Sequence, residues 1–227
     1  VEAELKRQLP KARVLRMDKN LTQTKGSHEQ IWHKFLNHEA DILVGTQMIA
    51  KGLDFPKVTL VGVLMADLSL KVPSYLASEE TFMLLTQISG RSGRHQKGEV
   101  IIQGYDLNHY AIKSLDKGYD SFYKEALYER RLSTYEPFSH VSQFLIEGQG
   151  YLKTYQVAFL LKKRLSNLED MTVLGPSTAL IKKIRLNFRF VVTIKYQTID
   201  FDTINEIIND LEDSEVRIKY YPNLDNI

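Results

Sequence analysis

The feature that most constrains the fold is an alternation of short apolar runs with helical stretches through the first half of the chain. The apolar runs are rich in valine, isoleucine and leucine, and between them apolar residues recur at helical spacing, as Ile31, Phe35 and Leu36 do. Strands that are apolar throughout, with helices between them, are typical of a parallel sheet covered on both faces. We therefore expect an α/β layer that ends near Tyr105, with strands within residues 12–17, 41–46, 58–66 and 99–105.

The second half follows a different order of elements. A helical stretch over 108–132 is broken at Pro137, because proline disfavours helix at the residue before it. The pattern then reads strand, helix, strand, strand, helix, strand, which predicts an antiparallel sheet with two helices on one face. The expected fold class is therefore α/β, a partial parallel-sheet lobe followed by an α+β domain of βαββαβ order. The expected limits are 1–107 for the lobe, 108–138 for a helical connector and 139–227 for the second domain.

Composition excludes several kinds of protein. The 227 residues include no cysteine, which rules out disulfides and thiolate metal sites within this chain and fits a reducing compartment such as the cytoplasm. No apolar run approaches the roughly 20 residues needed to span a bilayer, so no membrane partner is expected. The chain has no initiator Met and opens in an amphipathic helical pattern, so we expect it to be part of a longer protein.

Charge is segregated within the second half. Residues 151–197 carry nine Lys or Arg against two acids, whereas residues 198–227 carry eight acids against two basic residues. One interpretation is a basic surface that binds a polyanion, with Lys182, Lys183 and Arg185 at its centre. The other is that basic and acidic residues simply cover solvated faces, as basic runs on helices commonly do.

Two arginines beside glycines carry the first chemical signal, in the stretch QISGRSGR over residues 87–94. Arg91 and Arg94 lie three residues apart at the end of an expected helix, and each guanidinium is a planar fork that matches phosphate oxygens. Flanking glycines let the backbone approach closely and bring both side chains into a cleft. The pair therefore fits a γ-phosphate, with a Gly- and Arg-rich surface turn as the alternative.

A second motif lies about forty residues upstream, in GTQMIAKGLDFP over residues 45–56. A strand is expected to end at Gly45 and Thr46, and a threonine hydroxyl with backbone amides at a strand end can hold a nucleic-acid phosphate. Asp54 can accept a hydrogen bond from a ribose hydroxyl, or can be a turn residue beside glycine.

Together these stretches resemble motifs V and VI of superfamily two helicases, which lie in the second RecA-like lobe. The longer stretches ILVGTQMIAKGLDFPKVTLVGVLMAD, LLTQISGRSGR and GYDSFYKEALYERR are similar to the PriA family of replication-restart DNA helicases. The resemblance is strong through about residue 138. Beyond it, the resemblance depends on VLGPSTALIKKI, FRFVVTI and the order of elements. Asn187 stands where relatives have an arginine, while Arg189 remains.

The resemblance implies an ATP-driven 3′-to-5′ DNA helicase that acts at stalled forks, and it implies a role for each matched residue. Arg91 and Arg94 would be arginine fingers, and Gln87 would contact the nucleotide site. Gly52 and Asp54 would couple the nucleotide to DNA. The nucleic-acid contacts expected are Thr46, Lys51, Lys182, Lys183, Arg185 and Arg189.

Cofactors and partners follow from the same resemblance. The sequence has no P-loop, no DExH box and none of the family's zinc-binding cysteines, and the resemblance places all three ahead of these motifs. ATP, Mg²⁺ and zinc are thus expected of the full-length protein, with no metal held by this chain. This chain alone should bind ATP feebly and hydrolyse none. The expected partners are forked or single-stranded DNA, single-strand DNA-binding protein and primosome proteins, in the bacterial cytoplasm at the nucleoid.

Two other readings of function stay open. The chain could belong to another superfamily two enzyme, such as an RNA helicase, or be a non-catalytic adaptor whose βαββαβ domain binds partners. Among smaller signals, we expect Tyr119, Phe122, Tyr123 and Tyr128 to pack in a helical core rather than stack on bases. Asp67 follows a strand, at the edge where functional residues gather in α/β sheets.

Overall fold

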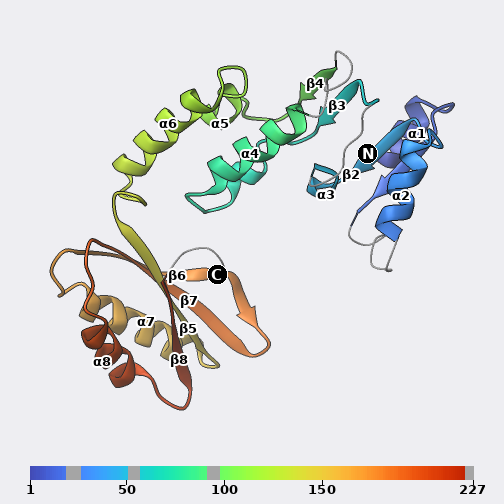
Figure 1. Ribbon diagram of the computed structural model, residues 1–227. Coiled ribbons are helices and arrows are strands. Elements are labelled where there is room, and N and C mark those ends of the chain that lie inside the picture. The colour runs from blue at the N-terminus through green and yellow to red at the C-terminus, as the bar shows by residue number, and fades with distance from the viewer. Residues whose placement is uncertain (19–26, 51–56, 91–97, 223–227) are drawn as a thin grey trace. The chain divides into compact units, whose positions relative to one another are not determined.

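The structure, a computed structural model, describes residues 1–18, 27–50, 57–90 and 98–222 (Figure 1). The chain forms two compact units, Val1–Tyr123 and Lys124–Ile227, which divide within one helix. Among the described residues, no helix is long and apolar enough to cross a membrane.

The first unit contains two pairs of parallel strands. Strand β1 (Val14–Met17) pairs with β2 (Ile42–Gly45), and β3 (Leu60–Val63) pairs with β4 (Glu99–Ile102). The parallel pairing confirms the predicted α/β class. The helices around them are α1 (Glu2–Gln8), α2 (Ser27–Leu36), α3 (Gln47–Ala50), the short 3₁₀ helix η1 (Ser69–Lys71), α4 (Ala77–Ser89), α5 (Tyr110–Lys113) and the first residues of α6 (Tyr119–Leu132).

The β3–β4 pair is covered on one face in the described part of the chain. Val63 and Ile102 pack with Leu85 of α4 and Ile112 of α5 in a small apolar cluster. On the other face Leu60 and Ile101 are exposed, so the expectation of cover on both faces does not hold here. Burial alternates along each strand, because successive side chains point to opposite faces.

Helix α4 is held by its buried face. Phe82 and Leu85 are buried, and the Thr81 hydroxyl donates to the Ala77 carbonyl at 2.7 Å. Phe82 stacks on Phe122 of α6, which confirms core packing for that aromatic residue. Tyr119 and Tyr123 are instead 63% and 48% exposed, since they lie at the margin of the Phe82–Phe122 contact.

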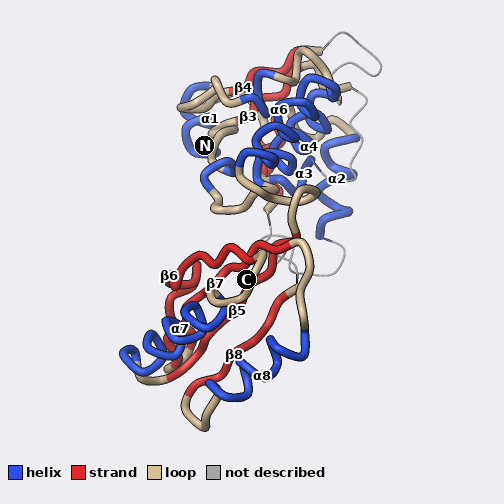
Figure 2. The backbone as a smooth tube through the Cα atoms, turned by 90° about the vertical axis from the view of Figure 1, so that its left-hand side faces the viewer, coloured by secondary structure: helices blue, strands red, loops and turns tan. Residues whose placement is uncertain are grey.

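The second unit confirms the predicted βαββαβ order. Its elements after α6 are β5 (His140–Gly148), α7 (Tyr151–Leu165), β6 (Met171–Ile184), β7 (Asn187–Tyr196), α8 (Phe201–Leu211) and β8 (Val216–Tyr221). The strands form one antiparallel sheet in the order β6-β7-β5-β8 (Figure 2).

Helices α7 and α8 pack on one face of this sheet. The main core joins alternate strand residues, such as Phe144 and Ile146 of β5, to Leu161 of α7 and Ile204 of α8. A period of two along each strand places these side chains on the same face. The opposite face has a smaller buried cluster of Leu145, Ala179 and Val191.

Candidate nucleotide and nucleic-acid surfaces

Helix α4 leads directly to the arginine motif. Gln87 lies exposed in its last turn, and the Gly90 amide still donates to the Thr86 carbonyl at 2.9 Å. Arg91 and Arg94 lie outside the described residues. The structure therefore establishes the helix that precedes the motif and the position of Gln87 at its end.

Close packing at the end of β2 sets the position of Thr46. A Cβ added at Gly45 would lie 2.3 Å from the Met17 carbonyl oxygen and 2.3 Å from Cδ1 of Ile49, so only glycine permits this approach of β2 to β1. The Ile49 amide donates to the Thr46 carbonyl at 3.0 Å, which starts α3. The Thr46 side chain is left exposed. Lys51, Gly52 and Asp54 lie outside the described residues.

Thr46 lines a shallow hollow of about 300 Å³ at the carboxyl ends of β1 and β2, with Glu2, Arg16 and Asp18 among its other residues. Arg16 forms an ion pair with Asp18, and its guanidinium lies 3.9 Å from Glu2. These two carboxylates neutralise the cation. An anion in this hollow could therefore contact the Thr46 hydroxyl, but it would find no free positive charge there.

Helices α3 and α4 lie beside each other although more than twenty residues separate them along the chain. The first helix ends immediately before Lys51, and the second ends two residues before Arg91. The two motifs thus follow neighbouring helices of the same unit.

Asp67 has a structural role at the carboxyl end of β3. It is buried, and its carboxylate accepts the backbone amides of Tyr105 and Asp106, each at 3.1 Å. Burial favours the neutral acid, but these amide hydrogen bonds outweigh it and hold the pKa of Asp67 below its usual value. The loop after β4 is thereby fixed against the end of β3.

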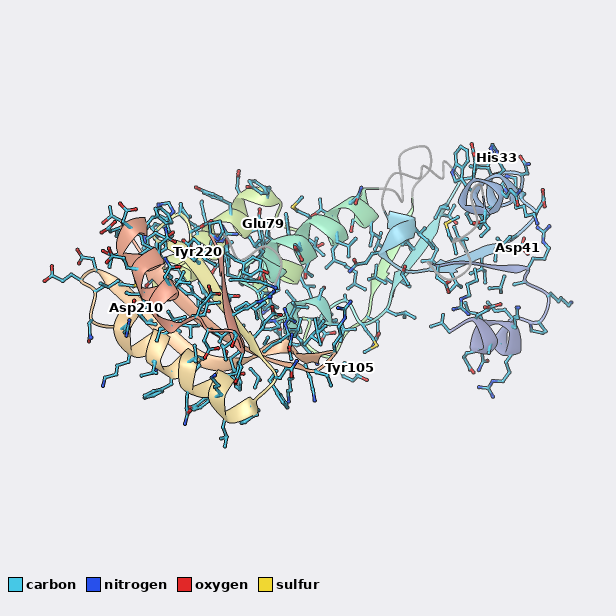
Figure 3. The ribbon with its side chains drawn as sticks, turned by 90° about the horizontal axis from the view of Figure 1, so that it is seen from below. His33, Asp41, Glu79, Tyr105, Asp210 and Tyr220 are labelled. Carbon is cyan, nitrogen blue, oxygen red and sulfur yellow. The ribbon has the colours of Figure 1, made fainter. Side chains whose placement is uncertain are left out.

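The basic residues of the second unit divide into two groups. Some are neutralised by acids of α8 and of the segment before β8: Arg164 lies 3.0 Å from Asp210 (labelled in Figure 3), and Lys153 contacts both Asp213 and Glu215. By contrast Lys182, Lys183 and Arg185 are exposed at the β6–β7 hairpin.

Arg189, in β7 of the same hairpin, already contacts a carboxylate. Its Nε donates to Glu147 at 3.0 Å, and Lys219 donates to the other oxygen of the same carboxylate at 2.6 Å. Burial favours neutral Glu147, but the two cations outweigh it and keep the pKa of Glu147 below its usual value. Glu147 lies 42 residues from Arg189 along the chain, so the local sequence around Arg189 does not predict this ion pair.

Comparisons with known proteins agree with this architecture. Residues 1–96 match the model of the helicase conserved C-terminal domain. The chain is 44% identical over 203 residues to the replication restart protein PriA of Bacillus subtilis (strain 168). This alignment covers 87% of this chain and 25% of that protein. The chain is also 36% identical to PriA of Chlamydia pneumoniae, over 86% of this chain and 27% of the relative.

A third relative extends the match over nearly the whole chain. PriA of Borreliella burgdorferi (strain ATCC 35210) is 33% identical over 233 aligned residues, or 98% of this chain and 35% of that protein. The chain spans about a quarter to a third of the length of these curated relatives. With the parallel strand pairs and the βαββαβ unit, these matches confirm the resemblance first seen in the motifs: over 86–98% of its length, the chain is similar to the PriA replication restart proteins.

Proposed function

We propose that the intact protein is an ATP-dependent 3′-to-5′ DNA helicase that acts in replication restart and primosome assembly at stalled forks. The observation that carries this proposal is the adjacency of α3 and α4, the helices that precede the two helicase motifs. A motor needs its nucleotide contacts and its DNA contacts on linked elements, and this adjacency provides the link. The relatives, all named replication restart proteins, support the same assignment.

In this proposal Arg91 and Arg94 are the arginine fingers. A transferring phosphoryl group spreads negative charge over its equatorial oxygens, and one fixed arginine stabilises that charge enough to accelerate transfer by about 10³–10⁵-fold. Gln87, exposed at the end of α4, contacts the nucleotide site. The phosphates and Mg²⁺ are held by a P-loop and a DExH box that this sequence lacks. The chain alone is therefore expected to hydrolyse no ATP.

The DNA track in this proposal begins at the carboxyl end of β2. The exposed Thr46 hydroxyl and Lys51 contact backbone phosphates, and Gly52 and Asp54 couple that contact to the nucleotide site. The hairpin cations Lys182, Lys183 and Arg185 add a second phosphate-binding surface. Arg189 of β7 is a further expected contact of this surface, although Glu147 balances its charge. Single-strand DNA-binding protein and primosome proteins are the proposed protein partners, with zinc held elsewhere in the intact protein, at the bacterial nucleoid.

The experiment is DNA-stimulated ATP hydrolysis by the intact protein with Arg94→Ala. Loss of about 10³-fold in turnover with an unchanged melting temperature is expected if the guanidinium stabilises transferred charge. Arg94→Lys is the matched control for charge, and it should restore little, because a lysine cannot offer a planar fork. Unchanged turnover in Arg94→Ala would contradict the assignment. A preference for RNA over forked DNA would select another superfamily two helicase.

A further inference from the structure

Helix α6 begins in the first unit and ends in the second, because the division of the chain falls after Tyr123. Near its start, the buried ring of Phe122 stacks on Phe82 of α4, and its centroid lies 5.8 Å from that of Tyr110 in α5. The end of α6 is held by different contacts, which all come from the second unit.

The C-terminus of α6 closes in a Schellman motif. The Tyr135 amide donates to the Arg130 carbonyl at 2.8 Å, and the Thr134 amide donates to the Arg131 carbonyl at 3.2 Å. Thr134 has φ 53°, the left-handed conformation that glycine usually adopts at this position. In such a turn the carbonyl of the residue directly after the helix, here Ser133, has no partner within the helix.

Lys195 of β7 supplies a partner for that carbonyl. Its Nζ donates to the Ser133 carbonyl at 2.5 Å and lies 3.7 Å from the centroid of the Tyr135 ring. A cation is favoured at this end of a helix, because the helix dipole is negative there, and it is also attracted to the face of an aromatic ring. The ammonium thus contacts both residues that flank Thr134 and holds the turn to the sheet of the second unit.

The segment that follows the turn is attached near the same strand. Gln197, directly after β7, donates from Nε2 to the Phe138 carbonyl at 2.7 Å. The Arg131 guanidinium, in the last turn of α6, lies 4.7 Å from the centroid of the Phe138 ring. Lys195 is therefore part of a group of contacts that fix the end of α6.

The position of Lys195 has an electrostatic cost. Burial lowers the pKa of Lys195, because the charged ammonium loses contact with water. A methionine of similar length would avoid this cost, but it could not donate to the Ser133 carbonyl. The residue found here thus favours the contact with α6 over the cheaper apolar side chain.

Between its two anchors, α6 is largely exposed. Phe122 and Ser133 are eleven residues apart, or about 16 Å along a helix. A helix of 14 residues is marginal in water by itself, so the order of α6 depends on the contacts at its ends. Tyr128 is 58% exposed, so the expectation that it packs in a core is wrong. The other exposed side chains in this stretch include Lys124, Glu125 and Glu129.

We propose that Lys195 is a positioning residue for the arginine motif: by holding the end of α6, it keeps Phe122 against Phe82 and so fixes α4. Lys195 touches neither nucleotide nor DNA in this proposal, and it acts through one continuous helix. Because α4 leads to Arg91 and Arg94, a small displacement of this helix moves the guanidinium groups away from the transferred phosphoryl group, and small misplacements are costly in catalysis. The effect on turnover rests on the proposed function, whereas the effect on α4 does not.

The test uses the intact protein with Lys195→Met, which keeps the length of the side chain but removes its charge and its donors. Lys195→Arg is the conservative variant. Lys163→Met is the matched control, since Lys163 is an exposed lysine of the same unit. A second pair of variants acts on the helix itself: Lys124 and Glu125 are both replaced by Gly, or both by Ala, which preserves helix.

Four quantities are measured. Hydrogen exchange followed by mass spectrometry reports the order of the α4 amides. DNA-stimulated ATP hydrolysis gives kcat and the KM for ATP, and fluorescence anisotropy gives the affinity for forked DNA. Thermal unfolding by circular dichroism shows whether each variant is folded.

Lys195→Met is expected to speed exchange of the α4 amides about tenfold and to lower kcat about tenfold. The KM for ATP and the affinity for DNA should stay within about twofold of the wild type, because Lys195 belongs to neither binding surface. Lys195→Arg and Lys163→Met should behave as the wild type does. The glycine pair should reproduce the effects of Lys195→Met, the alanine pair should not, and the glycine pair combined with Lys195→Met should add little, since both changes act through α6.

Wild-type exchange of α4 in Lys195→Met would overturn the inference, even if the melting temperature fell, because Lys195 would then stabilise only its own unit. Equal effects of the glycine and alanine pairs would also overturn it. So would an unchanged kcat in Lys195→Met when Arg94→Ala loses turnover. If Arg94→Ala itself keeps full turnover, the proposed function fails, and the exchange of α4 still decides whether Lys195 positions that helix.

Discussion

The ring of Phe82 lies flat against the ring of Phe122, with centroids 4.2 Å apart and planes inclined by 6°. This contact joins α4, the helix that leads to the arginine motif, to α6. Both rings are almost fully buried. The stack is thus a buried side-chain contact by which α6 supports the helix that carries Gln87.

We expect Phe122→Ala to destabilise the first unit by about 3–5 kcal/mol, because a buried aromatic ring is removed and a cavity remains. Chemical denaturation followed by circular dichroism measures the free energy of unfolding. The control is Tyr123→Ala, one residue further along α6, where the side chain is about half exposed and the cost should be below about 1 kcal/mol. Equal costs at the two positions would show that the ring stack does not support α4.

Removal of the Glu147 carboxylate should also lower the free energy of unfolding. Its two oxygens accept from Arg189 and Lys219, and the side chains of Glu147 and Arg189 are mostly buried. Glu147→Gln leaves these cations without their counter-charge, at an expected cost of about 2–3 kcal/mol. A double-mutant cycle with Arg189→Met measures the coupling energy, and a value near zero would contradict the assignment.

The order of elements could be predicted because each element carries its own periodicity. The β5 sequence HVSQFLIEG and the α7 sequence YLKTYQVAFLLKKRL show strand and helix patterns without reference to any other segment. The βαββαβ order followed from reading them in turn. The burial of β3 and β4 on both faces was predicted wrongly. An apolar run does not show whether other elements pack on one face of a strand or on both.

The β6–β7 hairpin could not be predicted from local pattern. The order of elements predicts a strand in this region, but it does not predict that β6 extends to Ile184. Residues 178–184 mix apolar and basic side chains without a period of two, and their conformation depends on cross-strand pairing with residues 187–190. The contact of Arg189 with Glu147 likewise joins two strands through a register that no single strand encodes.

Acid should weaken the second unit through Asp213. The hydrogen bond from Lys153, with backbone amides of Glu215 and Val216, lowers the pKa of Asp213 to about 2. A carboxyl whose pKa is depressed by folding contributes stability above its unfolded pKa and loses it as pH falls through the folded value. We therefore expect the melting temperature to fall between about pH 4 and pH 2, and to fall less steeply in Asp213→Asn. Lys153→Gln should also reduce the slope. A slope unchanged in both variants would exclude this pair as a source of acid sensitivity.

Alanine should destabilise the protein at Gly45 of β2 but not at Gly62 of β3. At Gly45 the added Cβ meets the Met17 carbonyl oxygen and the Ile49 side chain at 2.3 Å, and the carbonyl cannot move without breaking the β1–β2 pairing. Gly45→Ala should therefore cost about 1–3 kcal/mol and displace Thr46, so that DNA stimulates ATP hydrolysis by the intact protein less well. At Gly62 no atom lies within 4 Å of the added Cβ, so Gly62→Ala should change stability by less than about 0.5 kcal/mol and leave the stimulation intact. Thermal unfolding measures the first effect and a DNA titration of ATPase rate the second. If Gly45→Ala is destabilised but is stimulated by DNA as the wild type is, Thr46 does not contact the DNA backbone.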